Sequence, residues 1–304
     1  MTTELHNVPG ARQPDAGARQ PDAGAREAGA ELAKRAKALL ADGAVRAVLG
    51  WRAGLDPNQL QPALFEDATE LGDLLIEVEP GLNLAVYLRR AAVRRLFPVS
   101  ILTRPGDLRS IVVLVQEGQL KAEDVRPLLF DPGGASRAPA TLVSGDALAE
   151  LLPWLQAHYP ARDFTADRLE PVAALEKLTL AERWEFWVEQ SRRCLRCYAC
   201  REACPLCYCE RCIVDLTQPA WLEPSAHPRG SLNWNLIRAY HLAGRCTLCG
   251  ACESACPVGI PLMVLNRMLA HHVLAEFDFA PGLDPAGPPL LATWRREDPN
   301  ELFL

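Results

Sequence analysis

The sequence predicts an α+β protein, in which a small N-terminal α/β domain precedes a helical domain that contains all of the cysteines. Three observations lead to this prediction. Strand-like and helix-like segments alternate in the first half of the chain, which is typical of a parallel sheet covered by helices. All 11 cysteines lie between residues 194 and 256. The segments around them have apolar residues at helical spacing.

Length and charge limit the classes of function. A chain of 304 residues can form one large domain or two modest ones. Its net charge of −6 argues against a nucleic-acid partner, which usually meets a basic face. The N-terminus lacks the apolar core of a secretory signal. The longest uncharged stretch, residues 254–266, contains two prolines and is too short to span a membrane. We therefore expect a cytoplasmic protein with reduced thiols.

Residues 1–30 are predicted to form a disordered tail. Residues 10–30 are three copies of a seven-residue repeat, GARQPDA, GARQPDA and GAREAGA. No large apolar residue recurs in the repeat, and segments of this composition cannot bury enough surface to fold.

The α/β domain is predicted to cover residues 31–160. Its first helix begins at Glu31, where apolar residues take helical spacing. The later elements are a strand at 44–51, a helix at 82–96, a strand at 97–103, a helix at 107–118, a strand at 125–130 and a helix at 144–158. The strand–helix–strand order implies parallel strands joined by a right-handed crossover.

The cysteines follow in a second domain. The remaining segments are a linker at 161–178, a helical domain at 179–275 and a C-terminal tail at 276–304. Thr179 and Glu182 form a capping box for a helix that runs to the first cysteine. Further helices are expected within residues 231–246 and 261–274.

The cysteines form two runs with the same spacing. The first run is Cys194, Cys197, Cys200 and Cys204, and the second is Cys246, Cys249, Cys252 and Cys256. Both match the C-x-x-C-x-x-C-x-x-x-C-P pattern of two-cluster ferredoxins, in which the fourth cysteine ligates the other cluster. We therefore expect two [4Fe-4S] clusters held between helices. The first is assigned to Cys194, Cys197, Cys200 and Cys256, and the second to Cys246, Cys249, Cys252 and Cys204.

Zinc is the alternative metal. Structural zinc sites use separated Cys-x-x-Cys pairs that close a tetrahedron, which would leave the third cysteine of each run unused. Two complete runs therefore favour clusters. Cys207, Cys209 and Cys212 are surplus to the eight ligands. Three roles are open for them. They could form a third metal site with a fourth ligand such as His227, be inert, or replace one of the assigned ligands.

Other side chains near the cysteines are expected to pack or to shape the backbone. A core position is expected for Trp184, Trp187, Trp234, Tyr240 and His241, and a surface position for His271 and His272. Gly250 allows the backbone to approach the second cluster closely, and Tyr198 has the equivalent place in the first run.

The segments ERWEFWVEQSRRCLRCYACREACPLCYCERC and AYHLAGRCTLCGACESACPVGIP resemble ferredoxin-type subunits related to the beta subunit of deazaflavin-reducing hydrogenases and formate dehydrogenases. The segments AKALLADGAVRAVLGW, NLAVYLRR and LRSIVVLVQEGQL resemble the N-terminal domain of the same family, so the resemblance covers residues 31–275. Such subunits accompany heterodisulfide-reductase-like complexes. The resemblance implies redox partner proteins such as hydrogenase, formate dehydrogenase or heterodisulfide-reductase-like subunits.

One element departs from the family. After the strand the family usually has Gly-Cys-Asp-x-Arg, whereas this sequence has Pro105-Gly106-Asp107-Leu108-Arg109 and lacks the cysteine. The element opens a helix. Its candidate residues for an anion or flavin site are Arg104, Gly106, Asp107 and Arg109. A plain helix cap is the alternative.

The leading functional hypothesis is an electron-transfer subunit, in which two clusters relay single electrons between partner proteins of an oxidoreductase complex. No residue is assigned to acid–base or covalent catalysis. One alternative is a flavin-containing subunit of beta type that exchanges hydride with a deazaflavin or a nicotinamide, although no G-x-G-x-x-G run occurs. The other alternative is a zinc-stabilised interaction module. The sequence does not identify the electron donor or acceptor.

Overall fold

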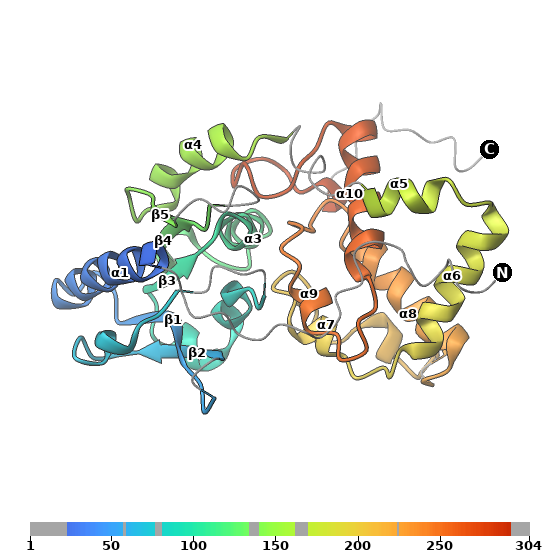
Figure 1. Cartoon of the computed structure of the whole chain (residues 1–304), viewed down its shortest axis with the longest axis horizontal. Coiled ribbons are helices and arrows are strands. Elements are labelled where there is room, and N and C mark those ends of the chain that lie inside the picture. The colour runs from blue at the N-terminus through green and yellow to red at the C-terminus, as the bar shows by residue number, and fades with distance from the viewer. Residues whose placement is uncertain are drawn as a thin grey trace.

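The computed structural model describes residues 23–56, 59–76, 81–133, 140–161, 170–223 and 225–292. Residues 1–22, which contain most of the repeat, and residues 162–169 of the predicted linker lie outside these ranges. Figure 1 shows an α/β half, which ends with α4, beside a helical half that contains α5 to α10. The predicted fold class is confirmed, because a mixed α/β half with a five-stranded sheet precedes a helical half with the cysteines.

The sheet has the strand order β2-β1-β3-β4-β5. The strands are β1 (Ala47–Ala53), β2 (Leu60–Phe65), β3 (Val99–Thr103), β4 (Val125–Asp131) and β5 (Thr141–Leu142). The three predicted strands are confirmed as β1, β3 and β4, which pair in parallel. The sequence analysis missed β2, an antiparallel edge strand that contains Pro62 opposite Trp51. Proline within a strand is tolerated at such an edge.

Helices cover the sheet and differ from the prediction in two places. They are α1 (Ala23–Ala41), the 3₁₀ helices η2 (Glu70–Asp73), η3 (Leu84–Arg89) and η4 (Ala122–Asp124), α2 (Ala91–Arg94), α3 (Pro105–Gln116) and α4 (Leu148–His158). The first helix begins at Ala23 rather than Glu31. The third copy of the repeat lacks proline and is rich in alanine, the best helix former. The helix predicted at 82–96 is split into η3 and α2 by Arg90, whose backbone is extended.

The helical half follows the predicted pattern. Its elements are α5 (Glu170–Glu176), α6 (Leu180–Arg193), α7 (Ala199–Glu202), η7 (Ile213–Asp215), α8 (Pro228–His241), α9 (Ala251–Ser254) and α10 (Leu262–Phe277). The capping box of α6 is confirmed, because Thr179 Oγ1 accepts from the Glu182 amide at 3.3 Å and Glu182 Oε2 accepts from the Thr179 amide at 2.8 Å. No helix in the described ranges is long and apolar enough to cross a membrane.

The segment after α10 returns to the α/β half. Gln116 Nε2 donates to the carbonyl oxygen of Gly287 at 2.9 Å, and Gln156 Nε2 donates to that of Leu283 at 2.8 Å. A short 3₁₀ helix, η8 (Leu290–Ala292), ends the described chain. The first part of the predicted C-terminal tail therefore packs against α3 and α4, and closes one side of the contact between the two halves.

Burial of the aromatic and histidine side chains agrees only in part with the prediction. Trp234 is buried and Trp187 is half-buried, whereas Trp184 is 61% exposed and Tyr240 is 60% exposed. The predictions for Trp184 and Tyr240 are wrong, and so is that for His241, which is also exposed. Trp184 and Tyr240 therefore lie on the solvent-facing sides of α6 and α8. His271 and His272 are exposed, as predicted.

Candidate functional site

The two cysteine runs share an unusual backbone. In the first run Arg196 and Tyr198 have φ angles of 52° and 61°, and in the second Leu248 and Gly250 have φ angles of 55° and 81°. These four residues have equivalent positions between the cysteines, and a one-turn helix follows each pair, α7 or α9. Residues other than glycine rarely adopt the left-handed region, and such strained positions concentrate at functional sites. Alternation of right- and left-handed residues turns successive amides toward one concave side, which suits an anionic group.

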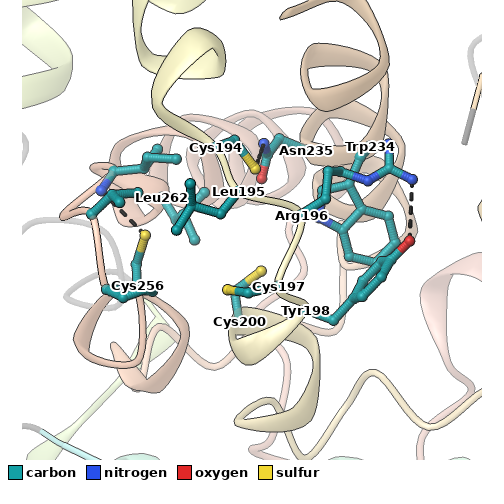
Figure 2. A pocket seen from close by; sticks show the side chains of 13 residues that line it. Cys194, Leu195, Arg196, Cys197, Tyr198, Cys200, Trp234, Asn235, Cys256 and Leu262 are labelled. Atoms are coloured by element: carbon teal, nitrogen blue, oxygen red, sulfur yellow. Dashed lines mark hydrogen bonds between the residues drawn. The ribbon is translucent and has the colours of Figure 1, made fainter. Parts of the chain in front are cut away.

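The first four-cysteine group lines an open pocket at the end of α6. Figure 2 shows that Cys194, Cys197 and Cys200 of the first run border the same opening as Cys256 of the second run. The other walls include Leu195, Trp234, Ile260 and Leu262, so they are largely apolar. The structure therefore brings together the four cysteines that the crossed pattern predicts for one cluster.

Hydrogen-bond donors approach the sulfur atoms of this group. Asn235 Nδ2 lies 3.8 Å from the Cys194 Sγ atom, and the Ile260 amide nitrogen lies 3.4 Å from the Cys256 Sγ atom (Figure 2). Burial raises the pKa of Cys200, Arg238 lowers it, and Cys194 and Cys256 raise it further. Cys256 therefore lies close enough to interact electrostatically with Cys200 of the other run.

The second four-cysteine group lies deeper. Burial raises the pKa values of Cys246, Cys249 and Cys252, that of Cys252 to about 12, and Cys204 raises each of them further. The side chains of Cys204 and Cys252 are buried. Asn266 Nδ2 lies 3.7 Å from the Cys252 Sγ atom, as Asn235 does beside Cys194. The fourth cysteine of the first run therefore lies with the second run.

The second cysteine loop rests on the N-terminal turn of α3. A Cβ atom added to Gly106 would lie 3.5 Å from the Cys249 Cβ atom. The Ser110 hydroxyl is 2.8 Å from the Thr247 hydroxyl and accepts from Asn83 Nδ2 at 2.9 Å. All three polar side chains are buried. This network fixes the position of the second cysteine loop against the α/β half.

The four candidate anion-site residues have partners within the protein. Arg104 Nε donates to Asp107 Oδ2 at 2.8 Å, and Asp107 Oδ2 accepts from the Arg104 amide at 3.0 Å, so Asp107 caps α3. Arg104 Nη2 also donates to the carbonyl oxygen of Leu82 at 2.9 Å. Arg109 points elsewhere, because it donates to the carbonyl oxygens of Tyr159 and Pro281. Burial lowers the pKa of Arg109 to about 10. Gly106 faces Cys249.

The surplus cysteines lie beside the second group. Burial, together with Cys204 and Cys212, raises the pKa of Cys207 to about 11, whereas Cys209 is exposed. Tyr208, between Cys207 and Cys209, donates to Glu117 Oε2 at 2.5 Å. Glu117 Oε1 also accepts from Arg245 Nε at 2.5 Å. Glu117 thus anchors both cysteine-containing segments to the end of α3.

His227 has hydrogen-bond partners at the start of α8. Its Nδ1 atom accepts from the Arg229 amide at 3.2 Å at the start of α8, and its Nε2 atom lies 2.5 Å from Glu223 Oε1. Among the described residues, no three His, Cys, Asp or Glu side chains converge on a position for a single metal ion. Zinc needs its donors around one point, whereas the thiolates of a cubane bind four different irons and stand farther apart.

Buried donors without a protein acceptor further fit a sulfur-rich cluster. Within the described ranges, five buried arginine Nε atoms have no hydrogen-bond partner, and three of them belong to Arg89, Arg196 and Arg238. Arg89 and Arg238 lie close enough to cysteines for the thiols to act on their charge, and Arg196 lies between Cys194 and Cys197 in the chain. Buried polar groups are rarely left unpaired, and an anionic cluster supplies acceptors. The residues therefore fit [4Fe-4S] clusters.

Several of these residues were missed by sequence reasoning. Arg238 follows Trp234 by four residues, so a charged side chain occupies the buried face of α8. That interruption of an apolar face was the available signal. Asn83, Ser110 and Glu117 belong to the α/β half, and nothing in their spacing connects them with the cysteines.

Comparison with known proteins defines the class first. The family model described as "4Fe-4S binding domain" matches residues 239–261, which contain the second cysteine run. The chain is therefore an iron–sulfur protein with a 4Fe-4S binding domain.

Two known proteins are similar in sequence to part of this chain. The chain is 34% identical over 131 residues to the F420-dependent formate dehydrogenase subunit beta of Methanocaldococcus jannaschii. This alignment covers 43% of this chain and 32% of the relative. It is also 31% identical over 107 residues to the F420-dependent formate dehydrogenase 1 subunit beta of Methanococcus maripaludis. That alignment covers 35% of this chain and 27% of the relative. The matches thus span about a third of the length of these curated relatives. The predicted resemblance to formate dehydrogenase beta subunits is confirmed over that part.

Proposed function

We propose that this chain is an electron-transfer subunit that binds two [4Fe-4S] clusters and works within a larger oxidoreductase complex. The observation that supports this best is the crossed arrangement of two four-cysteine groups, each with three cysteines from one run and one from the other. Cys194, Cys197, Cys200 and Cys256 would hold one cluster, and Cys246, Cys249, Cys252 and Cys204 the other. A bound [4Fe-4S] cluster supplies a carrier that accepts and returns one electron.

The protein's own residues exclude water and orient the ligands. Apolar walls from Trp234, Ile260 and Leu262 line the buried side of the first group. Asn235 and Asn266 place amide donors near one sulfur of each group. Burial and hydrogen bonding to sulfur are the features through which a protein adjusts cluster potentials. Cys200 and Cys252 interact electrostatically, so the two groups lie near each other, as a relay requires.

The two groups differ in their access to a partner protein. Cys197 is exposed, and its neighbour Leu195 is 62% exposed. The second group is enclosed by α3 and by the segment around Tyr208. We infer that a redox partner approaches the first group, and that the second group exchanges electrons with it through the first. The relatives are beta subunits of F420-dependent formate dehydrogenases, which supports a place in a multi-subunit complex.

The α/β half would then serve mainly to seat the second group. Arg104 and Asp107 stabilise the first turn of α3, and Gly106 leaves room for Cys249. We propose this structural role for the Pro105–Arg109 element. The same division leads us to propose two domains, residues 31–160 and 179–275, with the segment after Phe277 joining them.

The composition of the anaerobically reconstituted protein tests the proposal. We expect about eight iron and eight acid-labile sulfide per chain, because two four-iron clusters need that much. Cluster absorption without flavin absorption is expected, and two interacting signals should appear in the electron paramagnetic resonance spectrum after reduction. Iron near four per chain would contradict the second cluster, and stoichiometric zinc would favour the interaction module instead.

A further inference from the structure

Arg238 lies between the two four-cysteine groups. Its side chain is buried in α8, and its Nη2 atom donates to the carbonyl oxygen of Cys200 at 2.9 Å. The cysteines that act on its charge are Cys252, Cys204, Cys200 and Cys207. Cys200 belongs to the first group, whereas Cys252 and Cys204 belong to the second. One guanidinium group therefore faces both.

No carboxylate in the described part of the chain neutralises this cation. Nearby Arg201 is paired with Asp215 at 2.6 Å, and Arg245 is paired with Glu117 at 2.5 Å. Among the described residues, no carboxylate pairs with Arg238, and its Nε atom has no acceptor. Arginine keeps its proton in proteins, so a full positive charge remains buried beside thiolate ligands. A buried charge of this kind needs a counter-charge, and the two cysteine groups are the anions that face it.

We propose that Arg238 is a shared counter-ion that raises the reduction potentials of both clusters. This inference rests on the proposed two-cluster function. Each cluster becomes more negative by one charge when it is reduced, and a nearby cation in a low-dielectric interior stabilises the more negative state. Because the same guanidinium faces both groups, its removal shifts both potentials in the same direction. Reduction of one cluster adds a negative charge near the other, so the two reductions also oppose each other directly.

Two substitutions separate charge from shape. Arg238→Gln keeps an amide donor for the Cys200 carbonyl oxygen and removes the charge, whereas Arg238→Lys keeps the charge and removes the fork of donors. The full-length, anaerobically loaded protein is titrated potentiometrically and followed by electron paramagnetic resonance, with iron and sulfide counted in each sample. In the Gln variant we expect the equilibrium constant for reduction to fall roughly tenfold for each cluster, which is a shift of about 59 mV to more negative potential for one electron. The Lys variant should stay within about threefold of the unaltered protein.

Arg109→Gln is the matched control. Arg109 is also buried and donates to two backbone carbonyl oxygens, so the variant measures the general effect of losing a buried guanidinium. It should lower thermal stability and leave both potentials unchanged. The proposal is overturned if only one potential moves in the Gln variant, if neither moves, or if the Lys variant shifts as far as the Gln variant. If the Gln variant does not load, the Lys variant decides, and its failure to load also overturns the proposal. Unaltered protein with iron near four would instead contradict the two-cluster function.

Discussion

Single residues determine how the two cysteine runs are connected. Cys204 and Cys256 follow their runs at the same spacing, yet each lies with the other run. Each of these cysteines lies two residues after the end of a one-turn helix, α7 or α9, and points away from the loop that precedes that helix. The assignment of Cys204 to the second group can therefore be tested one residue at a time.

Replacing Cys204 by Ser should remove the cluster held by Cys246, Cys249 and Cys252, because its fourth ligand is lost. Iron and sulfide should fall to about half. Cys209→Ser is the control, since Cys209 is exposed and should leave the content unchanged. Loss of the first cluster instead, seen as the disappearance of its resonance signal, would mean that each run ligates locally.

The triple substitution Cys207→Ser, Cys209→Ser and Cys212→Ser should leave both clusters in place. Eight cysteines in the regular runs already satisfy two four-ligand clusters. Iron content and the cluster spectrum are the measurements. A discrete loss of metal would indicate a third site, with His227→Ala reproducing part of it. If the triple variant loses one cluster and the Cys204→Ser protein keeps both, the fourth ligand of the second cluster is one of the surplus cysteines and not Cys204.

Gly106 offers a matched pair of substitutions. An added Cβ atom would lie 3.5 Å from the Cys249 Cβ atom, an ordinary contact, so Gly106→Ala should be tolerated. Gly106→Val places two methyl groups in the same gap and should displace the second cysteine loop. We expect the Val variant to lose about half of its iron and the Ala variant to lose none. Equal loading of the two variants would show that α3 does not seat that loop.

At the scale of elements, the sequence predicts what depends on local pattern. Apolar runs identify β1, β3 and β4, and Thr179 with Glu182 identifies the start of α6. The pattern fails where an element is set by its partners, as for β2, which contains Pro62 and pairs only along β1. Left-handed backbone at Arg196 and Leu248 was not predictable, because neither residue favours it and the cysteine loops impose it. The spacing of the cysteines was enough to predict the two groups, whereas the position of Arg238 between them could be seen only in the fold.

The helix α6 ends at Cys194, the first cysteine of the first group. Its N-terminal cap should therefore stabilise the helix that leads to this group. Thr179→Ala removes the side-chain acceptor for the Glu182 amide and should cost about 1 kcal/mol of unfolding free energy. The midpoint of thermal unfolding should fall, with cluster content unchanged. Thr217→Ala alters an exposed threonine and serves as the control. If the two variants unfold at the same temperature, the cap does not stabilise the protein.

At the scale of the whole molecule, α3 is the helix on which the two halves meet. Its N-terminal turn contacts Cys249, and just beyond its C-terminal end Glu117 accepts from Tyr208 and Arg245. Two cation–π interactions add to this contact. The guanidinium carbons of Arg245 and Arg89 lie 5.3 Å and 5.6 Å from the centroid of the Tyr208 ring.

Glu117→Ala should therefore loosen the contact between the halves. The variant leaves Arg245 and Tyr208, which are partly buried, without their shared acceptor, and a donor left unsatisfied in this way costs on the order of 1–3 kcal/mol. We expect a lower unfolding temperature and faster proteolysis of the whole chain, with the first cluster retained. Glu123→Ala, at an exposed carboxylate, is the control. Unchanged stability of the Glu117 variant would place the main contact elsewhere.

The segment after α10 also sets an order of events during biosynthesis. Pro281, Leu283 and Gly287 accept hydrogen bonds from α3 and α4, yet they are translated after the last cysteine, Cys256. At about 5–20 residues per second, ribosomes need a few seconds to add them. During that interval both cysteine loops already exist while one side of α3 is still uncovered. This segment can therefore complete its packing against α3 and α4 only after every cysteine of the chain has been synthesised.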